Sequence, residues 1–390
     1  LLTLGAAERP GWQVAAAAAL LGLAGMVEVP VTSGNRLSMA WAVAASLPFV
    51  FRGDGGVAAV SVVAAYAGGL ALLWAFRTLR GESPLEVLAE SVRRSAGLVV
   101  YLLALVAVSG WSVLGRIEEG WRDIVPVTVA AALWLAVEVA LWATLSAGSA
   151  LLSRRYLALL AMKDLNVMIG LVATGALFGL SFADLGWWSL GIAAVPYLFA
   201  HNAFGRFQAT RRTYRQTIRA LARIPEVAGL ATAGHSDRTA ELAVAVAKDL
   251  GLTPDEVAEV EFAALMHDIG RITLNEPSIV RMGFTDEDIA RWGSEIISEA
   301  PYLRRVAGHV RNQHEPYRRP GEERDPGLAM ASKIIRAASA YDHAQADQGC
   351  SPLEAVEVLH RGAAYDFDPD VVASVRRVLE ERRVFEPVRA

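Results

Sequence analysis

Hydrophobic residues are unevenly distributed along this chain of 390 residues, with long apolar runs in the first half and amphipathic helical periodicity in the second. A run of about 20 apolar residues is long enough to cross a hydrocarbon core of about 30 Å. Seven candidate spans precede residue 206: Trp12–Val29, Leu37–Phe51, Val57–Phe76, Ala96–Leu114, Ile124–Leu145, Tyr156–Phe182 and Trp188–Phe204. The pattern predicts a polytopic helical membrane domain over residues 1–206.

Basic residues between the predicted spans set the orientation of this domain, because short loops rich in Lys and Arg stay on the cytoplasmic side. In a seven-span arrangement the basic clusters all fall on one side: Arg77, Arg80, Arg93, Arg94, Arg154, Arg155, Arg206, Arg211, Arg212 and Arg215. Only three of the 37 basic residues are lysines, a usage typical of GC-rich bacterial genomes. We therefore expect a multi-pass protein of the bacterial inner membrane, with its N-terminus outside and its C-terminal domain in the cytosol.

Two ionisable residues interrupt the predicted spans, and a charge inside a bilayer is costly enough to suggest a function. Glu138 in the fifth span and Lys163 in the sixth lie at roughly the same depth when the two helices are antiparallel, at about 1.5 Å of rise per residue. We predict a Glu138–Lys163 ion pair that fixes helix packing or lines a signal pocket. In the alternative interpretation, Lys163 extends to the membrane surface from a span that begins near Leu165.

A basic helix is predicted between the two halves, over Gln208–Ala222 and within a connector at residues 207–229. Its apolar stripe consists of Tyr214, Ile218 and Leu221, which is less than two heptads. We interpret the segment as a juxtamembrane connector that is compatible with a homodimer.

The second half, residues 230–390, shows successive helices and no run with strand alternation. Helix-start signals, a capping residue followed by early acids, occur at Thr253, Thr285 and Ser351. The expected helices are His235–Leu250, Pro254–His267, Asp286–Ser298, Tyr302–Asn312, Leu328–Ala344, Pro352–Arg361 and Pro369–Arg382. The whole chain is therefore predicted to be all-α.

Composition narrows the possible functions. The net charge of −4 gives no electrostatic basis for binding DNA or RNA. The single cysteine, Cys350, excludes an intramolecular disulfide and a thiolate zinc cluster.

Adjacent His267 and Asp268 end an apolar helix, and His235 begins another helix upstream. Imidazole nitrogen and carboxylate oxygen together suit a first-row divalent metal, which can turn bound water into a nucleophile near neutral pH. The pattern points to hydrolysis of a phosphate ester.

Six motifs occur in order in the second half: Gly-His-Ser-Asp-Arg at 234–238, Asp-Leu-Gly-Leu at 249–252, His-Asp-Ile-Gly-Arg-Ile at 267–272, Gln-His-Glu at 313–315, Ile-Ile-Arg-Ala-Ala-Ser-Ala-Tyr-Asp at 334–342 and Phe-Asp-Pro at 367–369. Over about residues 221–380 the chain resembles the HD superfamily of metal-dependent phosphohydrolases. Within it, the chain resembles the HD-GYP subfamily, whose members typically hydrolyse cyclic di-GMP.

The resemblance implies metal-ligand roles for His235, His267 and Asp268, with His314 as a further ligand. The metal would be a divalent ion such as Fe, Mn, Zn or Mg. Arg271 stands where the family usually has Lys, and either cation suits a phosphate oxygen. The implied catalytic residues are Asp268 and Arg271.

The chain departs from the family pattern at several positions. Gln313 replaces the first His of the His-His-Glu motif, Ser339 stands at the last metal-binding Asp, and the Gly-Tyr-Pro signature is absent. A complete site for two or three metals is therefore not expected. Asp342 and His309 are candidate replacement ligands, and His343 is expected at the surface.

Two functions remain open at this level. The first is a membrane-bound signalling protein with a cyclic di-GMP phosphodiesterase-like domain, which acts on a cyclic dinucleotide or another nucleotide. The second is a catalytically degenerate HD domain that binds a nucleotide or a protein and transmits a signal from the membrane half. A phosphohydrolase that uses one metal on another nucleotide also fits the minimal ligand set.

Overall fold

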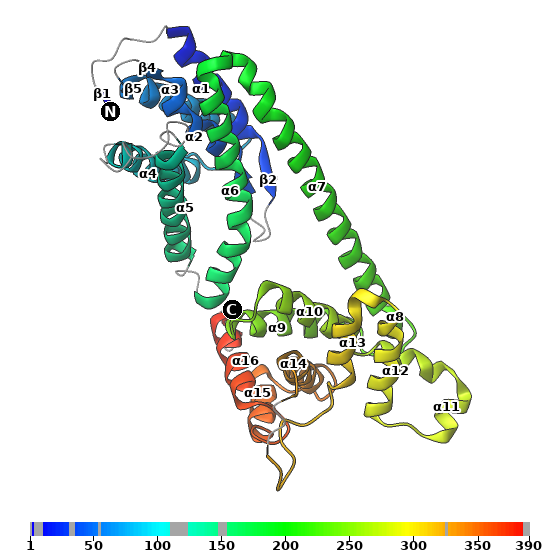
Figure 1. Cartoon of the computed structure of the whole chain (residues 1–390). Helices are drawn as coiled ribbons and strands as arrows, with labels where there is room; N and C mark the ends of the chain where they lie inside the picture. Colours follow the sequence, from blue (N-terminus) through cyan, green and yellow to red (C-terminus); the bar gives the residue numbers. More distant parts are fainter. Residues whose placement is uncertain are drawn as a thin grey trace. The chain divides into compact units, whose positions relative to one another are not determined.

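The computed structural model of the chain describes residues 2–3, 11–30, 36–53, 56–109, 124–146, 154–323 and 327–384. Helices make up most of these residues (Figure 1), so the predicted all-α class is confirmed. The chain forms two compact units. Unit 1 consists of Leu1–Leu145 and Leu160–Gln208, and unit 2 consists of Ser146–Leu159 and Ala209–Ala390.

The apolar half consists of long helices connected by short segments. Its helical elements are α1 (Gly11–Met26), α2 (Ala40–Val50), α3 (Ala59–Leu79), α4 (Pro84–Ser109), α5 (Ile124–Ser146), α6 (Arg154–Leu185), η3 (Gly186–Trp188) and α7 (Ser189–Ala222). Five strands of two or three residues accompany them: β1 (Leu2–Thr3), β2 (Glu28–Pro30), β3 (Arg36–Ser38), β4 (Arg52–Gly53) and β5 (Gly56–Ala58). Such strands are too short to produce an alternating pattern in the sequence.

Four helices in the described residues are long and apolar enough to cross a membrane: Val60–Leu79, Pro84–Val108, Ile124–Leu141 and Arg155–Phe182. They correspond to the third to sixth predicted spans. The first two predicted spans correspond to shorter apolar helices, Gly11–Met26 and Ala40–Val50. These helices are consistent with a membrane protein, while the count of seven spans and the orientation stay predictions.

Glu138 of α5 is buried, with 2% of its surface exposed. A Cβ atom at Gly97 of α4 would lie 2.5 Å from its Oε1 atom and 2.3 Å from Nε1 of Trp134. Because Gly97 has no side chain, the carboxyl group of Glu138 can lie close to the backbone of α4. The ion pair between Glu138 and Lys163 of α6 stays a prediction.

Unit 2 contains the predicted helices and three short elements that the sequence analysis did not predict, namely α8, η4 and α11. Its elements are α8 (Ile224–Val227), α9 (His235–Asp249), α10 (Pro254–Met266), η4 (Ile269–Asn275), α11 (Pro277–Met282), α12 (Asp286–Ser298), η5 (Pro301–Leu303), α13 (Arg304–Arg311), α14 (Met330–Ala346), α15 (Pro352–Arg361) and α16 (Pro369–Glu381). The predicted caps are confirmed, because Thr253, Thr285 and Ser351 each form a reciprocal capping box.

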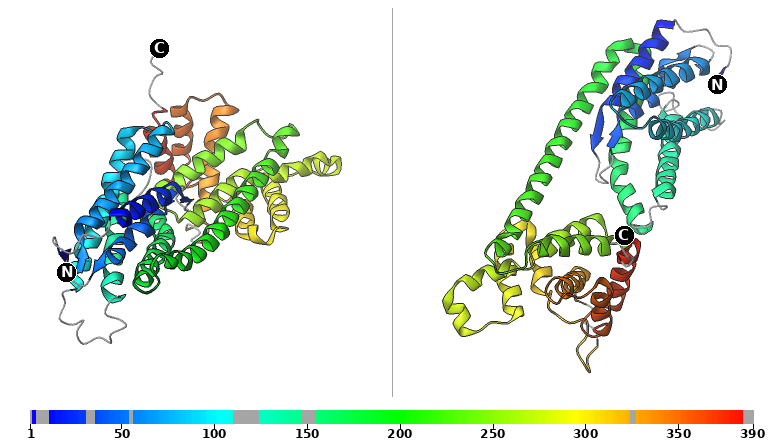
Figure 2. Two further views of the ribbon diagram at one scale, coloured as in Figure 1. Left: turned by 90° about the horizontal axis from the view of Figure 1, so that it is seen from above. Right: turned by 180° about the vertical axis from the view of Figure 1, so that it is seen from behind.

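Helix α14 is the centre of this domain. It packs against α9, α10, α13, α15 and α16, and the views in Figure 2 show it among these helices. Ile334, Ile335 and Ala338 of α14 are fully buried. Side chains on the remaining face of α14 are therefore held by a rigid element.

The connector end of α7 packs within unit 2. Arg215 and Arg219 form ion pairs with Glu261 of α10 at 3.1 and 3.3 Å. The ring of Tyr214 lies 5.6 Å from that of Tyr302, and Ile218 is buried. Tyr214 and Ile218, two residues of the apolar stripe, thus pack within the chain. Dimerisation stays a prediction.

Gly270 marks a close approach between η4 and α12. A Cβ atom at this position would lie 2.0 Å from the backbone oxygen of Ile289 and 2.7 Å from the backbone nitrogen of Gly293. Backbone atoms cannot move aside as the end of a flexible side chain can. Gly270 therefore keeps η4, which follows Asp268, in contact with α12.

We predict that Gly270→Ala destabilises unit 2 by roughly 1–3 kcal/mol or more, because α12 must shift to admit the methyl group. Hydrogen exchange of α12 peptides, measured by mass spectrometry on the full chain, should accelerate. Gly308→Ala in α13 is the matched control, since a Cβ atom there meets nothing within 4 Å. It should be neutral or stabilise by about 0.5–1 kcal/mol.

For the membrane half, we predict that Glu138→Gln and Lys163→Met each lower the thermal stability of the chain in detergent. Combined, they should show a coupling free energy of about 0.5–3 kcal/mol in a double-mutant cycle, as expected for residues in contact. Strictly additive effects, or wild-type stability of Glu138→Gln, would exclude the ion pair.

Candidate metal centre

Three buried side chains from consecutive elements converge in unit 2. His235 is the first residue of α9, His267 follows the last residue of α10, and Asp268 precedes η4. The Nε2 atoms of the two imidazoles are 3.1 Å apart. Oδ2 of Asp268 lies 3.8 Å from Nε2 of His235 and 3.7 Å from Nε2 of His267. The sequence prediction that these three residues form one cluster agrees with this geometry.

The outer nitrogens of both imidazoles have fixed hydrogen-bond partners. Nδ1 of His235 lies 2.7 Å from Oδ2 of Asp342, and Nδ1 of His267 lies 2.8 Å from the carbonyl oxygen of Ala264. Because a carboxylate and a carbonyl only accept, each Nδ1 donates, and in a neutral ring Nε2 then carries a lone pair.

The inner atoms of the cluster therefore present three electron-pair donors to one another. Oδ2 of Asp268 is buried and has no hydrogen-bond partner in the described structure, which is uncommon for a carboxylate oxygen. Two nitrogen lone pairs and a carboxylate oxygen at these separations repel one another unless a cation lies between them. This donor set fits a divalent metal ion.

The surroundings hold His267 and Asp268 in the protonation states that metal binding requires. Burial lowers the pKa of His267 to about 4, although the Asp268 carboxylate opposes the shift. Burial alone would raise the pKa of Asp268, but the neighbouring His267 and the Arg271 guanidinium lower it to about 2. At neutral pH the imidazole of His267 is thus uncharged and Asp268 is an anion.

Asp342 supports the cluster from outside. Its carboxylate accepts from Nδ1 of His235 and from Nε and Nη2 of Arg238, the last two at 2.7 and 2.9 Å. Burial would raise the pKa of Asp342, but the hydrogen bonds from His235 and Arg238 lower it to about 2. Asp342, a candidate replacement ligand by sequence, therefore orients the predicted ligand His235 in this structure.

Glu226, which belongs to α8 in the connector, fixes the start of α9. Its two carboxylate oxygens accept the backbone N–H groups of Gly234 and Ser236 at 2.9 and 3.1 Å. Gly234 has a φ of 74°, a left-handed conformation that favours glycine. The backbone on both sides of His235 is thereby held by one side chain.

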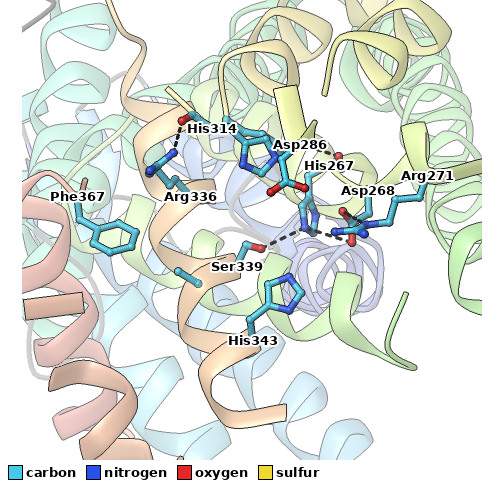
Figure 3. Close-up of a pocket in the computed structure, with 11 residues that line it drawn as sticks. His267, Asp268, Arg271, Asp286, His314, Arg336, Ser339, His343 and Phe367 are labelled. Carbon is cyan, nitrogen blue, oxygen red and sulfur yellow. Dashed lines mark hydrogen bonds and ion pairs between the residues drawn. The ribbon is translucent and has the colours of Figure 1, made fainter. Parts of the chain in front are cut away.

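A cavity of about 240 Å³ opens beside the cluster (Figure 3). It is lined by His267, Asp268, Arg271, Asp286, Gln313, His314, Arg336, Ser339, Ala340, His343 and Phe367. Arg271 donates from Nε to Oδ1 of Asp268 at 2.8 Å, which places its guanidinium at the junction of cluster and cavity. The predicted metal ligands His267, Asp268 and His314 thus line the same cavity as the predicted phosphate-binding cation Arg271.

Two further predicted ligands lie outside the three-atom cluster. His314 lines the cavity, where burial lowers the pKa of its ring, and its role as a fourth ligand stays a prediction. Nε2 of His309 lies 3.4 Å from Oε2 of Glu259, and His309 is not among the residues that line the cavity.

The two substituted family positions have structural roles here. Gln313 is buried and donates from Nε2 to the backbone oxygen of His267 at 2.9 Å. The hydroxyl of Ser339 lies 3.5 and 3.4 Å from Nε2 of His235 and of His267. An amide and a hydroxyl thus occupy places where the resemblance implied metal ligands.

Several residues of the cavity wall were not predicted as site residues from the sequence. His343 was expected at the surface; its side chain is 37% exposed, and it also lines the cavity, with its ring 4.3 Å from that of His235. Arg336, Ser339, Ala340 and His343 are spaced i, i+3, i+4 and i+7, so they share one face of α14. This helical spacing is visible in the sequence, and it predicts that these residues lie on the same face of the helix as Ser339.

Comparison with known proteins agrees with this site. Residues 232–344 match the family model of the HD domain. The cyclic di-GMP phosphodiesterase response regulator RpfG of Xanthomonas campestris pv. campestris (strain 8004) is 35% identical over 74 residues. That match covers 19% of this chain and 20% of the relative, so the chain spans about a fifth of the relative's length. The C-terminal part of the chain thus carries an HD domain.

We predict that the purified chain binds a divalent metal and that His235→Ala or Asp268→Ala reduces the metal content to background. Asp342→Asn should weaken metal affinity by about 10–100-fold, because it removes the group that orients His235 without removing a ligand. Inductively coupled plasma mass spectrometry after dialysis against graded chelator measures both effects. His309→Gln serves as the control and should retain metal; loss of metal from it would contradict this ligand assignment.

Proposed function

We propose that the chain is a membrane-bound signalling protein with a metal-dependent, cyclic di-GMP phosphodiesterase-like domain at residues 230–390. Residues 1–206 would act as a transmembrane sensor and residues 207–229 as the connector, in a bacterial inner membrane. The observation that carries the proposal is the convergence of Nε2 of His235, Nε2 of His267 and Oδ2 of Asp268 beside a cavity that also contains Arg271.

His235, His267 and Asp268 would hold the metal, which when bound supplies a Lewis acid and a water activated near neutral pH. Arg271 uses its Nε on Asp268 within the described part of the chain, so its two Nη groups remain for an anion. A planar guanidinium is suited to two oxygens of a phosphate and to the charge that develops on them during hydrolysis. Asp268 thus links the metal to the phosphate-binding cation.

Burial of the cluster supports this assignment. His235, His267 and Asp268 are only 1%, 2% and 5% exposed. Exclusion of bulk water strengthens the electrostatic interactions of the site. The cavity lined by His267, Asp268 and Arg271 provides the space in which a phosphodiester would meet the cluster.

The departures at Gln313 and Ser339 define a second candidate function. With a hydroxyl and an amide in place of metal ligands, the described cluster has three protein ligands, which suits one metal rather than two or three. A degenerate domain would use the same cavity to bind a nucleotide or a protein partner and would transmit the state of the membrane half. A phosphohydrolase that uses one metal on another nucleotide is compatible with the same ligand set.

We predict that the full chain in nanodiscs, loaded with Mn²⁺ or Fe²⁺, hydrolyses cyclic di-GMP or another nucleotide phosphodiester. Asp268→Ala should reduce turnover to background. Arg271→Ala should lower kcat/KM by about 100-fold, the scale for loss of a group that stabilises transition-state charge. Arg271→Lys should retain more activity, since it keeps the cation. Turnover is followed by chromatography of the products.

The second function predicts different results for the same samples. A wild-type chain that binds cyclic di-GMP but, with or without metal, turns over neither it nor any other nucleotide tested would support the signal transducer and exclude the enzyme. Arg361→Gln, an exposed change on α15 beside Glu357, is the matched control and should leave turnover unchanged.

A further inference from the structure

Arg336 is the second guanidinium that lines the cavity. It extends from α14, and its side chain is 21% exposed. Nη1 donates to the backbone oxygen of His314, and Nη2 lies 3.3 Å from Oδ1 of Asp366. Its Nε is buried and has no hydrogen-bond partner within the described residues. A buried N–H group of a permanent cation is therefore left unsatisfied beside the cavity, at a considerable energetic cost.

The neighbours of Arg336 do not neutralise it well. The carbonyl of His314 has no net charge, and Asp366 is 58% exposed, so water screens its carboxylate. The other face of the guanidinium approaches an apolar ring, because Cζ of Arg336 lies 5.8 Å from the centre of Phe367. These contacts fix the orientation of the side chain and leave its charge available to an anion.

Arg336 lies less than one helical turn before Ser339, the residue of α14 that approaches the candidate metal centre. It precedes Ser339 by three residues, which corresponds to about 4.5 Å along the axis of α14. The Ser339 hydroxyl lies within 3.5 Å of both ligand imidazoles. In Figure 3, Arg336 and Phe367 lie on one side of Ser339, and Asp268 and Arg271 lie on the other. The cavity thus has a cation at each end.

We propose that Arg336 binds a second phosphate group of the substrate while Arg271 and the candidate metal centre engage the phosphate that reacts. This inference rests on the proposed function and assigns a residue to the second phosphate group of its substrate. The cavity selects molecules that carry two phosphate groups, such as a dinucleotide, over a lone phosphodiester. Arg336 is then a specificity-determining residue, whose guanidinium charge attracts the second phosphate at this end of the cavity.

The kinetic test compares cyclic di-GMP, which has two phosphate groups, with bis(p-nitrophenyl) phosphate, which has one, on the full metal-loaded chain in nanodiscs. Arg336→Gln should raise KM for cyclic di-GMP by about 10–100-fold, the range for loss of a hydrogen-bonded charge pair. It should leave kcat for that substrate, and kcat/KM for the single phosphodiester, within about threefold of wild type. Arg336→Lys, which keeps the charge and loses the planar fork, should lie between the two.

The control is Arg376→Gln, which removes an exposed arginine that pairs with Glu380 on α16, and it should change neither substrate. A purely structural role for Arg336, in which it only ties the His314 backbone to Asp366, predicts equal losses on both substrates. Equal losses would therefore overturn the inference, as would an unchanged KM for cyclic di-GMP.

A binding measurement separates this inference from the proposed function. Calorimetry of the wild-type chain should show tighter binding of pyrophosphate than of orthophosphate, and Arg336→Gln should abolish most of the difference. If the wild type hydrolyses neither substrate yet shows this difference, the proposed function fails and the second phosphate subsite stands. If the wild type binds both anions equally, or if the variant keeps the difference, the subsite is overturned.

Discussion

The candidate site depends on one electrostatic constraint: two imidazole lone pairs and a carboxylate oxygen are held within 4 Å of one another in a buried place. The arrangement is repulsive by itself, so the fold must hold it from outside. Asp342 and the carbonyl of Ala264 fix the imidazole rings, and Arg271 fixes the carboxylate. These contacts orient the donor atoms before any cation binds, which reduces the cost of ordering them during binding.

Much of unit 2 was predictable because its signals are local. The capping boxes at Thr253, Thr285 and Ser351 define helix starts through side chains three residues apart, and the structure confirms them. The cluster was also predictable, since His267 and Asp268 are adjacent and His235 begins a nearby helix. The elements η4 and α11 escaped prediction because they are short and lack a clear apolar period.

The cavity wall was harder to predict because it is assembled from segments far apart in the chain. Asp286, His314 and Phe367 meet there only through the packing of unit 2. The roles of Asp342 and Gln313 depend on which atoms they approach, and spacing along a helix does not reveal this. Gln313 illustrates the point: its residue type indicated a lost ligand, whereas its position shows a donor that supports the backbone of His267.

Glu226 relates the end of α7 to the position of His235. Metal–ligand distances tolerate changes of only about 0.2 Å. The Glu226 carboxylate accepts hydrogen bonds from the backbone on both sides of His235, and Glu226 lies four residues beyond the end of α7. A shift of the last turn of α7 could move Glu226 by a fraction of an ångström. The imidazole of His235 would then move away from His267 and Asp268, the other two candidate ligands. The affinity of the candidate centre for a divalent ion would then depend on the position of the end of that helix.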